Sequence, residues 1–407
     1  MNGANAVRRR LLMGCLLFVL NAFSMSLTLA QTCASENQLF VLQGDQLPAL
    51  SGFPINHLSI KRWNGKRFQS VVFQIDRRDK QGSFDFSEDK NALFDNNDEL
   101  SILNRLAGDR YKEYRHNVQI LAEVSVPAGK QGRDQWVYVF NGRSEDFPGY
   151  EPPVKYNAIE DTVQTGTYLA GFSAVHPFLI TDFRWRDPKT GNYSKDLVDT
   201  MKIRHHGRLF GVLKFHRSQL DYTSTLIAVK QGPLRIIRRT ENRVRVFWKL
   251  KSPSVMIDYV MMPDGFVMDT LIDLPFRLGA FFKGLETVTT VDWNQRVLDL
   301  QFSGVDESSN ELFRVDGSMS EAESELNLQQ GNMFQLASTH GKMLIILGLP
   351  QDLPIRSWEY YIDDSAAIDP PEFTPGQYGN LGFRTTGWEN VMPGLSHVDF
   401  AVCMGAQ

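Results

Sequence analysis

The residues best suited to do chemistry form a basic and aromatic tract in the middle of the chain. Arg243 and Arg245 are two residues apart, so on a strand their side chains would project from one face. Trp248 and Lys249 follow closely. A positive face with exposed rings suits an anionic polymer, for instance an acidic polysaccharide, through charge pairing and stacking. These four residues are a candidate ligand-binding site, and a solvated sheet face balanced by acidic neighbours is the favoured interpretation.

A second candidate is the acidic run DNNDE. In it, Asp95, Asn97 and Glu99 place oxygen ligands at alternating positions, which suits a hard cation such as calcium. The pattern departs from an EF-hand loop, because Leu100 stands at the glycine position and Leu106 at the bidentate glutamate position. The run is therefore a candidate calcium site, and a polar turn leading into the strand from Leu100 is the favoured interpretation.

A third candidate is the histidine group His205, His206 and His216. If the chain bends into a hairpin after His206, then His206 and His216 approach each other, and two imidazoles with a carboxylate suit zinc or a similar ion. However, Arg204 and Arg208 lie in the same stretch and repel cations, and no HExxH motif occurs. Surface histidines among arginines are the favoured interpretation.

Known catalytic signatures are absent from the sequence. There is no GxSxG nucleophile elbow, no phosphate-binding glycine loop placed between a strand and a helix, and no CxxCH haem motif. Carboxylates such as Asp258, Asp264, Asp269 and Asp273 are plentiful, but most stand where turns favour aspartate. Glycosidase chemistry needs two carboxyl groups about 5–10 Å apart, a distance that the sequence does not give. Whether the protein is an enzyme stays undecided at this stage.

The elements that must position these residues are strands. Alternating apolar and polar residues predict a small N-terminal β-sandwich whose strands cover residues 57–63, 68–76, 100–106, 118–126 and 135–140. A stretch rich in glycine, proline and charge follows at residues 141–153. Its consecutive prolines remove backbone donors and end a sheet, so the predicted domains are residues 31–150 and 151–407.

The second domain also reads as strands. They are expected at residues 165–172, 178–185, 208–215, 223–229, 234–239, 243–250, 255–262, 266–271, 287–293, 297–302, 333–338 and 343–349. Many short strands at close spacing favour a larger antiparallel β-sandwich, which makes the whole chain all-β with little helix. Residues 196–203 are expected to make two helical turns, residues 320–328 a short helix or acidic loop, and residues 397–403 a closing strand.

The first thirty residues have the order of a secretory signal peptide. Arg8, Arg9 and Arg10 precede an apolar run that ends at Ala30, and polar residues follow. Residues 1–30 are therefore expected to be removed and the mature protein exported, to the periplasm or the exterior. A lipoprotein, a twin-arginine signal and an uncleaved anchor are the alternatives. No later apolar run is long enough to span a bilayer, so no membrane span is expected after cleavage.

Cysteine usage agrees with export. Cys33 and Cys403 remain after cleavage, and an even pair in an oxidising compartment predicts a disulfide between the two ends of the mature chain. Two unpaired thiols near frayed ends are the alternative.

Net charge and composition limit the kinds of partner that the protein can have. The net charge of −4 gives no overall attraction to nucleic acid, and a hydrophobic content of 42% is ample for a core. No cofactor is indicated apart from the calcium ion considered above.

Two functions are consistent with these features. The first is a non-enzymatic binding or structural protein of the cell envelope or exterior, whose partner is an anionic polysaccharide or another envelope protein. The second is a carbohydrate-active enzyme, a lyase or hydrolase acting on an anionic polysaccharide. In a lyase the basic face would neutralise a uronate carboxylate while a tyrosine or histidine moves the proton.

Overall fold

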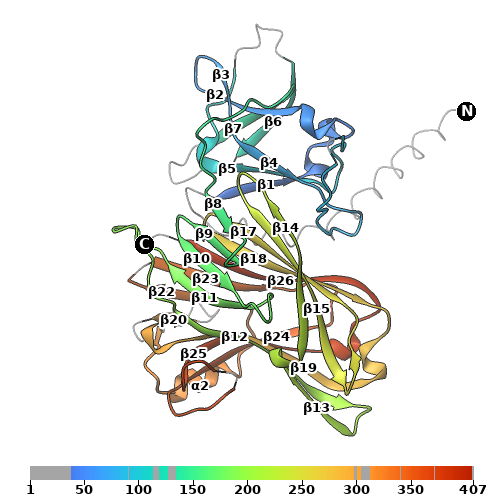
Figure 1. The fold of residues 1–407 in the computed structure, drawn as a ribbon, viewed down its shortest axis with the longest axis vertical. Coiled ribbons are helices and arrows are strands. Elements are labelled where there is room, and N and C mark those ends of the chain that lie inside the picture. The colour runs from blue at the N-terminus through green and yellow to red at the C-terminus, as the bar shows by residue number, and fades with distance from the viewer. Residues whose placement is uncertain are drawn as a thin grey trace, which may run out of the picture.

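The chain folds into stacked antiparallel sheets, as the sequence predicts (Figure 1). The computed structural model describes residues 38–89, 91–112, 119–126, 134–297, 300–303, 312–339, 341–370 and 372–405. The sequence favours strands because it is rich in phenylalanine, with 27, and clusters this residue with valine and isoleucine. Aromatic and β-branched side chains pack well on a pleated surface.

The first seven strands form two small sheets around one apolar core. One sheet has the order β1 (Leu39–Gln43), β5 (Glu99–Leu103), β4 (Phe73–Asp76). The other has the order β3 (Phe68–Ser70), β2 (Leu58–Trp63), β7 (Gln135–Asn141), β6 (Ile120–Val126). Leu100 and Ile102 from the first sheet pack with Val137 and Val139 from the second. The stretch expected as a single strand at residues 68–76 is divided between the two sheets.

A ten-stranded sheet forms the middle layer of the molecule. Its order is β14 (Tyr222–Gln231), β15 (Ile236–Phe247), β17 (Val255–Met262), β18 (Gly265–Leu274), β26 (Gly394–Gly405), β23 (Gly341–Gly348), β22 (Met333–Ser338), β20 (Gln301–Ser303), β21 (Phe313–Arg314), with β16 (Leu250–Lys251) paired to β15. Both faces are apolar: Ile236 and Tyr259 belong to one core cluster, and Ile237 and Val260 to another. Such a sheet must be covered on both sides.

Two further sheets cover one face of this layer. The five-stranded sheet has the order β13 (Leu213–Ser218), β12 (Val198–Leu209), β19 (Phe282–Trp293), β25 (Gln377–Thr386), β24 (Arg356–Asp364). The four-stranded sheet has the order β11 (Ile180–Trp185), β10 (Tyr168–Phe172), β9 (Thr162–Thr165), β8 (Val154–Asn157). Met201, Phe383 and Phe183 from these sheets join Tyr259 in the main core. The other face of the five-stranded sheet carries polar side chains, which are buried at one end of the face and partly exposed at the other.

Helices are few among the described residues. The one α-helix, α2 (Glu321–Leu326), confirms the short helix expected at residues 320–328, and it begins with a capping box in which Ser320 and Glu323 bond each other's backbone N–H. Short 3-10 turns are η1 (Gly44–Gln46), η2 (Pro48–Leu50), η3 (Ile55–His57), η4 (Asn104–Leu106), η5 (Gln219–Asp221), η6 (Leu278–Ala280), η7 (Gln295–Val297) and η8 (Trp388–Asn390).

The helix expected at residues 196–203 is wrong, because residues 198–203 belong to β12. Its residues are buried on both sides of the sheet, so they lack the alternation that would mark a strand: Met201 enters the main core, and Lys202 is buried on the opposite face. These residues form a strand because they pair with β19, which lies about ninety residues later in the chain.

The small sandwich covers the second face of the ten-stranded sheet. Val41 and Leu103 from its own strands pack with Val260, Val267 and Ala401 from the larger sheet. Figure 1 shows the small sandwich at the top of the view, above the sheets of the larger region.

Buried charges accompany this apolar contact. The Arg235 guanidinium lies 2.7 Å from Asp76 Oδ2 and 2.5 Å from Glu99 Oε2, and all three side chains are almost fully buried. Glu99 Oε1 also accepts a bond of 2.5 Å from Arg78 Nε. Phe84 lies between the two arginines, with its ring centroid 3.6 Å from the Arg78 guanidinium and 5.6 Å from that of Arg235. The ion pairs thus join the two regions.

The network continues across a row of aspartates on three adjacent strands. Asp258 is directly opposite Asp269, which is directly opposite Asp399, and all three are buried. Like charges placed opposite each other repel, so partners are needed. Arg239 forms bonds of 2.7 and 2.6 Å with Asp258, and His397 Nδ1 lies 3.0 Å from Asp269 Oδ1.

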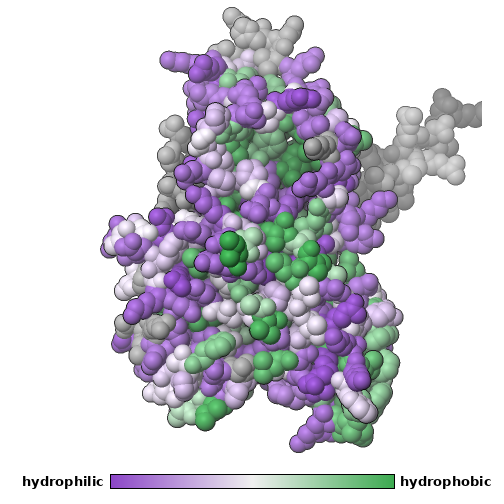
Figure 2. All heavy atoms as spheres, in the orientation of Figure 1, coloured by the Kyte–Doolittle hydropathy of each residue, from purple (hydrophilic) through white to green (hydrophobic). Residues whose placement is uncertain are grey.

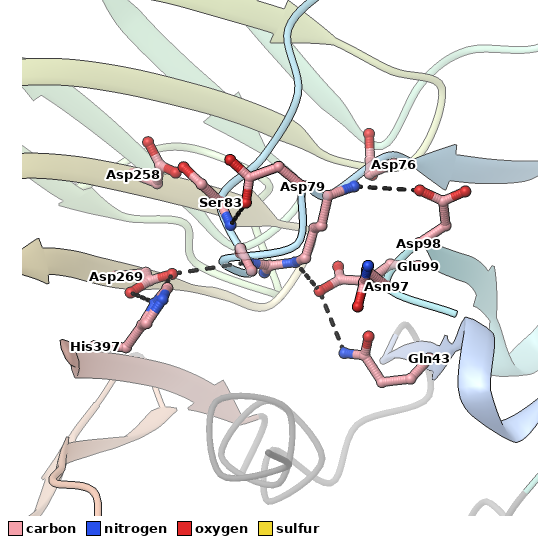
Figure 3. A network of polar contacts seen from close by, with 12 residues as sticks. Gln43, Asp76, Asp79, Ser83, Asn97, Asp98, Glu99, Asp258, Asp269 and His397 are labelled. Carbon is pink, nitrogen blue, oxygen red and sulfur yellow. Dashed lines mark hydrogen bonds and ion pairs between the residues drawn. The ribbon is translucent and has the colours of Figure 1, made fainter. Parts of the chain in front are cut away.

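Figure 3 shows both parts of this network, with Glu99 and Gln43 on one side and Asp269 with His397 on the other. Because these side chains are mostly buried and satisfy one another, we assign the network to docking of the small sandwich on the larger sheet.

Several sequence predictions concern residues outside the described ranges. The signal peptide at residues 1–30 and Cys33 belong to this group, whereas Cys403 is buried on β26. Export and the disulfide between Cys33 and Cys403 therefore stay predictions, as does the division into domains near residue 150. Among the helices of the described ranges, none combines the length and the apolar character that crossing a bilayer requires.

The first prediction concerns the buried ion pairs. Arg235→Ala leaves Asp76 and Glu99 as buried carboxylates without this guanidinium, and it is expected to lower the free energy of unfolding by about 3–5 kcal/mol. The matched control Arg243→Ala removes a half-exposed arginine that pairs with Glu241, and it should cost at most about 1 kcal/mol. Urea unfolding measures both. Equal losses for the two variants would contradict the assignment.

The second prediction concerns pH. Burial lowers the pKa of His397, and the nearby Arg78 acts in the same direction, but the hydrogen bond and charge of Asp269 outweigh them and raise the pKa above its usual 6.5. Charged His397 therefore stabilises the fold fully below pH 6.5, and this contribution is lost as pH rises through the raised value.

His397→Gln should remove this part of the pH dependence, so the melting temperature of the variant should change less than that of the wild type between pH 5.5 and 8.5. His57→Gln, at an exposed position in η3, is the control. A His397 variant whose melting temperature follows the wild-type pH profile would refute the role of this ion pair.

Candidate functional site

Charged and aromatic side chains gather on the outer face of the five-stranded sheet. Residues directly opposite each other on paired strands share a face, so the register defines rows across the sheet. One row is His216, His206, Glu286, Thr386, Arg356. The next is Arg204, Val288, Arg384, Trp358. The third is Lys202, Thr290, Gly382, Tyr360.

The third row is covered by a segment between β24 and β25 that includes Asp369 and Phe373. The buried Lys202 ammonium lies 2.6 Å from Asp292 Oδ2, donates to the Asp369 carbonyl at 2.9 Å and to Gln377 Oε1 at 3.2 Å. Burial raises the pKa of Asp292 to about 6, against the opposing effect of Lys202. Asp199 also accepts backbone bonds from this segment. The segment is thereby fixed, and this end of the face is structural.

The first row includes the histidine pair. His206 and His216 are register partners, and their Nδ1 atoms lie 3.0 Å apart, which confirms the expected hairpin. The single strand expected at residues 208–215 is wrong, because the turn of this hairpin lies at residues 210–212. Burial lowers the pKa of His206, and the neighbouring His216 and Arg204 lower it further. An imidazole held neutral can accept a proton.

A zinc site at the pair finds no support. Among the described residues, no group of three or more histidine, cysteine, aspartate or glutamate side chains is arranged to hold a metal ion. The carboxylate opposite His206, Glu286, lies 3.8 Å from the Arg384 guanidinium.

Aromatic side chains lie on the edge strand β24. The Trp358 ring faces the Arg384 guanidinium at 5.4 Å, and both side chains are partly exposed. Tyr360 follows on the same face, and burial raises the pKa of its hydroxyl, which therefore stays protonated as a donor. These residues offer a stacking surface and hydrogen-bond donors.

A groove of about 560 Å³ opens at the ends of β24 and β25. We call it the strand-end groove; it is lined by Leu353, Pro354, Ile355, Arg356, Trp358, Thr386, Gly387, Glu389 and Asn390. Gly387 has a φ of +93°, and a Cβ there would lie 2.2 Å from the Pro354 carbonyl oxygen. Glycine is thus required for the close turn that shapes the groove.

Two polar groups in the strand-end groove lack protein partners. Arg356 is exposed at the start of β24, and its guanidinium forms no ion pair within the described ranges. Glu389 Oε2 is buried and has no hydrogen-bond partner among the described residues. Buried acceptors are usually satisfied. Because this oxygen is inaccessible to solvent, a ligand donor reaches it only if the Glu389 side chain turns toward the groove.

The predicted basic residues lie together on one hairpin. Arg243 bonds Glu241 at 2.9 Å, and Arg245 bonds Asp221, as a balanced sheet face would. Trp248 and Lys249 are exposed in the turn between β15 and β16. None of the four predicted residues lines the strand-end groove.

The predicted calcium ligands are engaged with protein groups. Asp95 Oδ1 accepts a bond of 2.8 Å from the Asn97 backbone, which forms a polar turn. Both oxygens of Glu99 contact the arginines of the docking network. The local contacts favour the polar turn, and calcium binding stays a prediction without support from them.

Comparisons with known proteins assign no family. No protein-family model matches the chain, and no curated protein matches it. Solved structures with some likeness include an α-mannosidase from Enterococcus faecalis V583, at 9% identity and a TM-score of 0.49, covering 92% of this chain and 42% of that one. A 4-α-glucanotransferase from Thermococcus litoralis has 9% identity and a TM-score of 0.33, covering 62% and 39%. This chain spans less than half of either protein, and such low scores identify neither a family nor an activity.

Proposed function

We propose that the protein binds an acidic saccharide in the strand-end groove. The observation that carries the proposal is that one groove combines the guanidinium of Arg356, the indole ring of Trp358 and a buried carboxylate oxygen of Glu389. Within the described ranges, the guanidinium has no ion pair and the oxygen has no hydrogen-bond partner. Concave sites that fix a ligand with a few convergent polar groups are the usual binding sites of proteins.

Each group suits one part of a sugar acid. A guanidinium can bind a carboxylate through two parallel hydrogen bonds, so Arg356 fits the acidic group. The Trp358 ring offers an apolar surface for the C–H face of a pyranose. If the Glu389 side chain turns toward the groove, its Oε2 can accept a bond from a sugar hydroxyl, and satisfying such an acceptor is worth about 1–3 kcal/mol.

A second candidate function is cleavage of the same class of polymer by β-elimination. The observation in its favour is the neutral His206, which lies in the same row as Arg356. Three strand spacings separate the two positions, about 14 Å, so only an extended polymer could reach both. His206 would remove the C5 proton adjacent to a uronate carboxylate; a double bond forms between C4 and C5, the bond from C4 to the glycosidic oxygen breaks, and the departing oxygen takes a proton from water.

The third prediction tests the groove. Wild-type protein should bind uronate oligosaccharides more tightly than neutral glucans, and added salt should weaken this preference. Arg356→Gln should weaken uronate binding at least tenfold while leaving neutral-sugar binding unchanged, because it removes the charge alone. Trp358→Ala should weaken both. Titration calorimetry measures the affinities.

Arg243→Gln is the matched control, since it neutralises a partly exposed arginine outside the groove. Uronate binding that survives Arg356→Gln and Trp358→Ala but is lost in Arg243→Gln would overturn the assignment of the site. An absorbing unsaturated product formed by the wild type and not by His206→Ala would establish the lyase, whereas binding without product leaves the protein a binder.

A further inference from the structure

Two neighbouring hairpins expose aromatic residues at their tips. Phe210, in the turn between β12 and β13, is 64% exposed, and Trp248, in the turn between β15 and β16, is 80% exposed. Both have positive φ, +51° for Phe210 and +44° for Trp248, whereas glycine is the usual residue in such turns. The backbone is therefore strained at two positions that display a large apolar ring to solvent.

Further exposed apolar side chains surround these tips. Phe281 lies 6.1 Å from Phe210 between ring centroids and 4.9 Å from Phe276. We define the tip surface as the exposed residues Phe210, Val212, Leu213, Phe247, Trp248, Leu250, Phe276 and Phe281. Figure 2 shows apolar surface at the lower right end of the molecule, where Figure 1 places the end of β13.

The two hairpins are held side by side. Arg217 on β13 donates to the backbone carbonyls of Arg245 at 2.6 Å and Val246 at 2.7 Å. Val246 also packs against the buried cluster that contains Phe215 and Phe282. The tips therefore form one preorganised surface and not two independent loops.

The segments that carry the tip surface have basic residues and no acidic ones. Residues 206–218, 243–252 and 274–284 include no aspartate or glutamate. They include nine basic residues: Arg208, Lys214, Arg217, Arg243, Arg245, Lys249, Lys251, Arg277 and Lys283. Arg243 and Arg245 are paired with acids from outside these segments, whereas Lys214, Lys249 and Lys283 are exposed beside the aromatic tips.

We infer that the tip surface docks on an anionic membrane, with the rings of Phe210 and Trp248 in the headgroup region and the lysines against lipid phosphates. Aromatic rings favour the membrane–water interface, and basic residues add attraction to anionic lipids. A soluble polyanion would need the basic charges but would not require bulky apolar residues held at strained turn positions. This inference does not depend on the groove or on its ligand.

The fourth prediction tests docking with vesicles. Wild-type protein should co-sediment with vesicles that contain phosphatidylglycerol at least tenfold better than with pure phosphatidylcholine vesicles. Phe210→Ser with Trp248→Ser should abolish most of this binding, and Lys214→Gln with Lys249→Gln should remove the preference for anionic lipid. Ile159→Ser is the matched control, because Ile159 is 97% exposed but lies in the turn between β8 and β9.

The outcomes separate this inference from the alternatives. Arg356→Gln should bind vesicles like the wild type, so loss of saccharide binding and loss of docking are distinguishable. All variants change exposed residues, and unchanged melting temperatures would show that they fold. Equal binding to both kinds of vesicle, or binding unaffected by the double serine change, would overturn the inference. So would a dextran sulfate interaction that depends on the lysines, if no vesicle binding accompanies it.

Discussion

The need to cover both faces of the ten-stranded sheet is the constraint on which the rest of the structure depends. Its two faces carry separate apolar clusters, with Tyr259 in one and Val260 in the other. The five- and four-stranded sheets bury the first face, and the small sandwich buries the second. This arrangement leaves the outer face of the five-stranded sheet, at one side of the stack, as a broad sheet face on which polar side chains can meet a ligand.

Charge gives the sandwich contact its specificity. Apolar packing between Val41 and Val260 would tolerate sliding, whereas Arg235 must meet Asp76 and Glu99 in one arrangement. Buried ions are costly to separate from their partners, so a displaced sandwich would leave charges unsatisfied. The aspartate row follows the same logic, because its mutual repulsion is tolerable only while Arg78, Arg239 and His397 face it.

The sequence predicts those features of the fold that depend on residues close together in the chain, and it does not predict those that depend on contacts between distant residues. Local patterns predict most strands, the capped helix at residues 320–328 and the approach of His206 to His216. Long-range contacts cannot be predicted from local patterns. Distant segments bury the two sides of β12, and Asp269 pairs with His397, which lies 128 residues away in the sequence. The strand-end groove was not predictable in this way either. The sequence pattern indicates no strand at β24 or β25, yet their pairing brings Arg356 and Trp358 close to Glu389.

The two proposed surfaces lie at the same end of the five-stranded sheet. Leu209 at the end of β12 is opposite Phe282 at the start of β19, and Glu286 on β19 is opposite Thr386, which is opposite Arg356. The tip surface follows Leu209, and the strand-end groove follows Thr386. A protein docked through Phe210 and Trp248 would therefore hold its groove close to the lipid surface. If both proposals hold, the saccharide would be one attached to the membrane or packed against it, and docking would raise the local concentration of ligand.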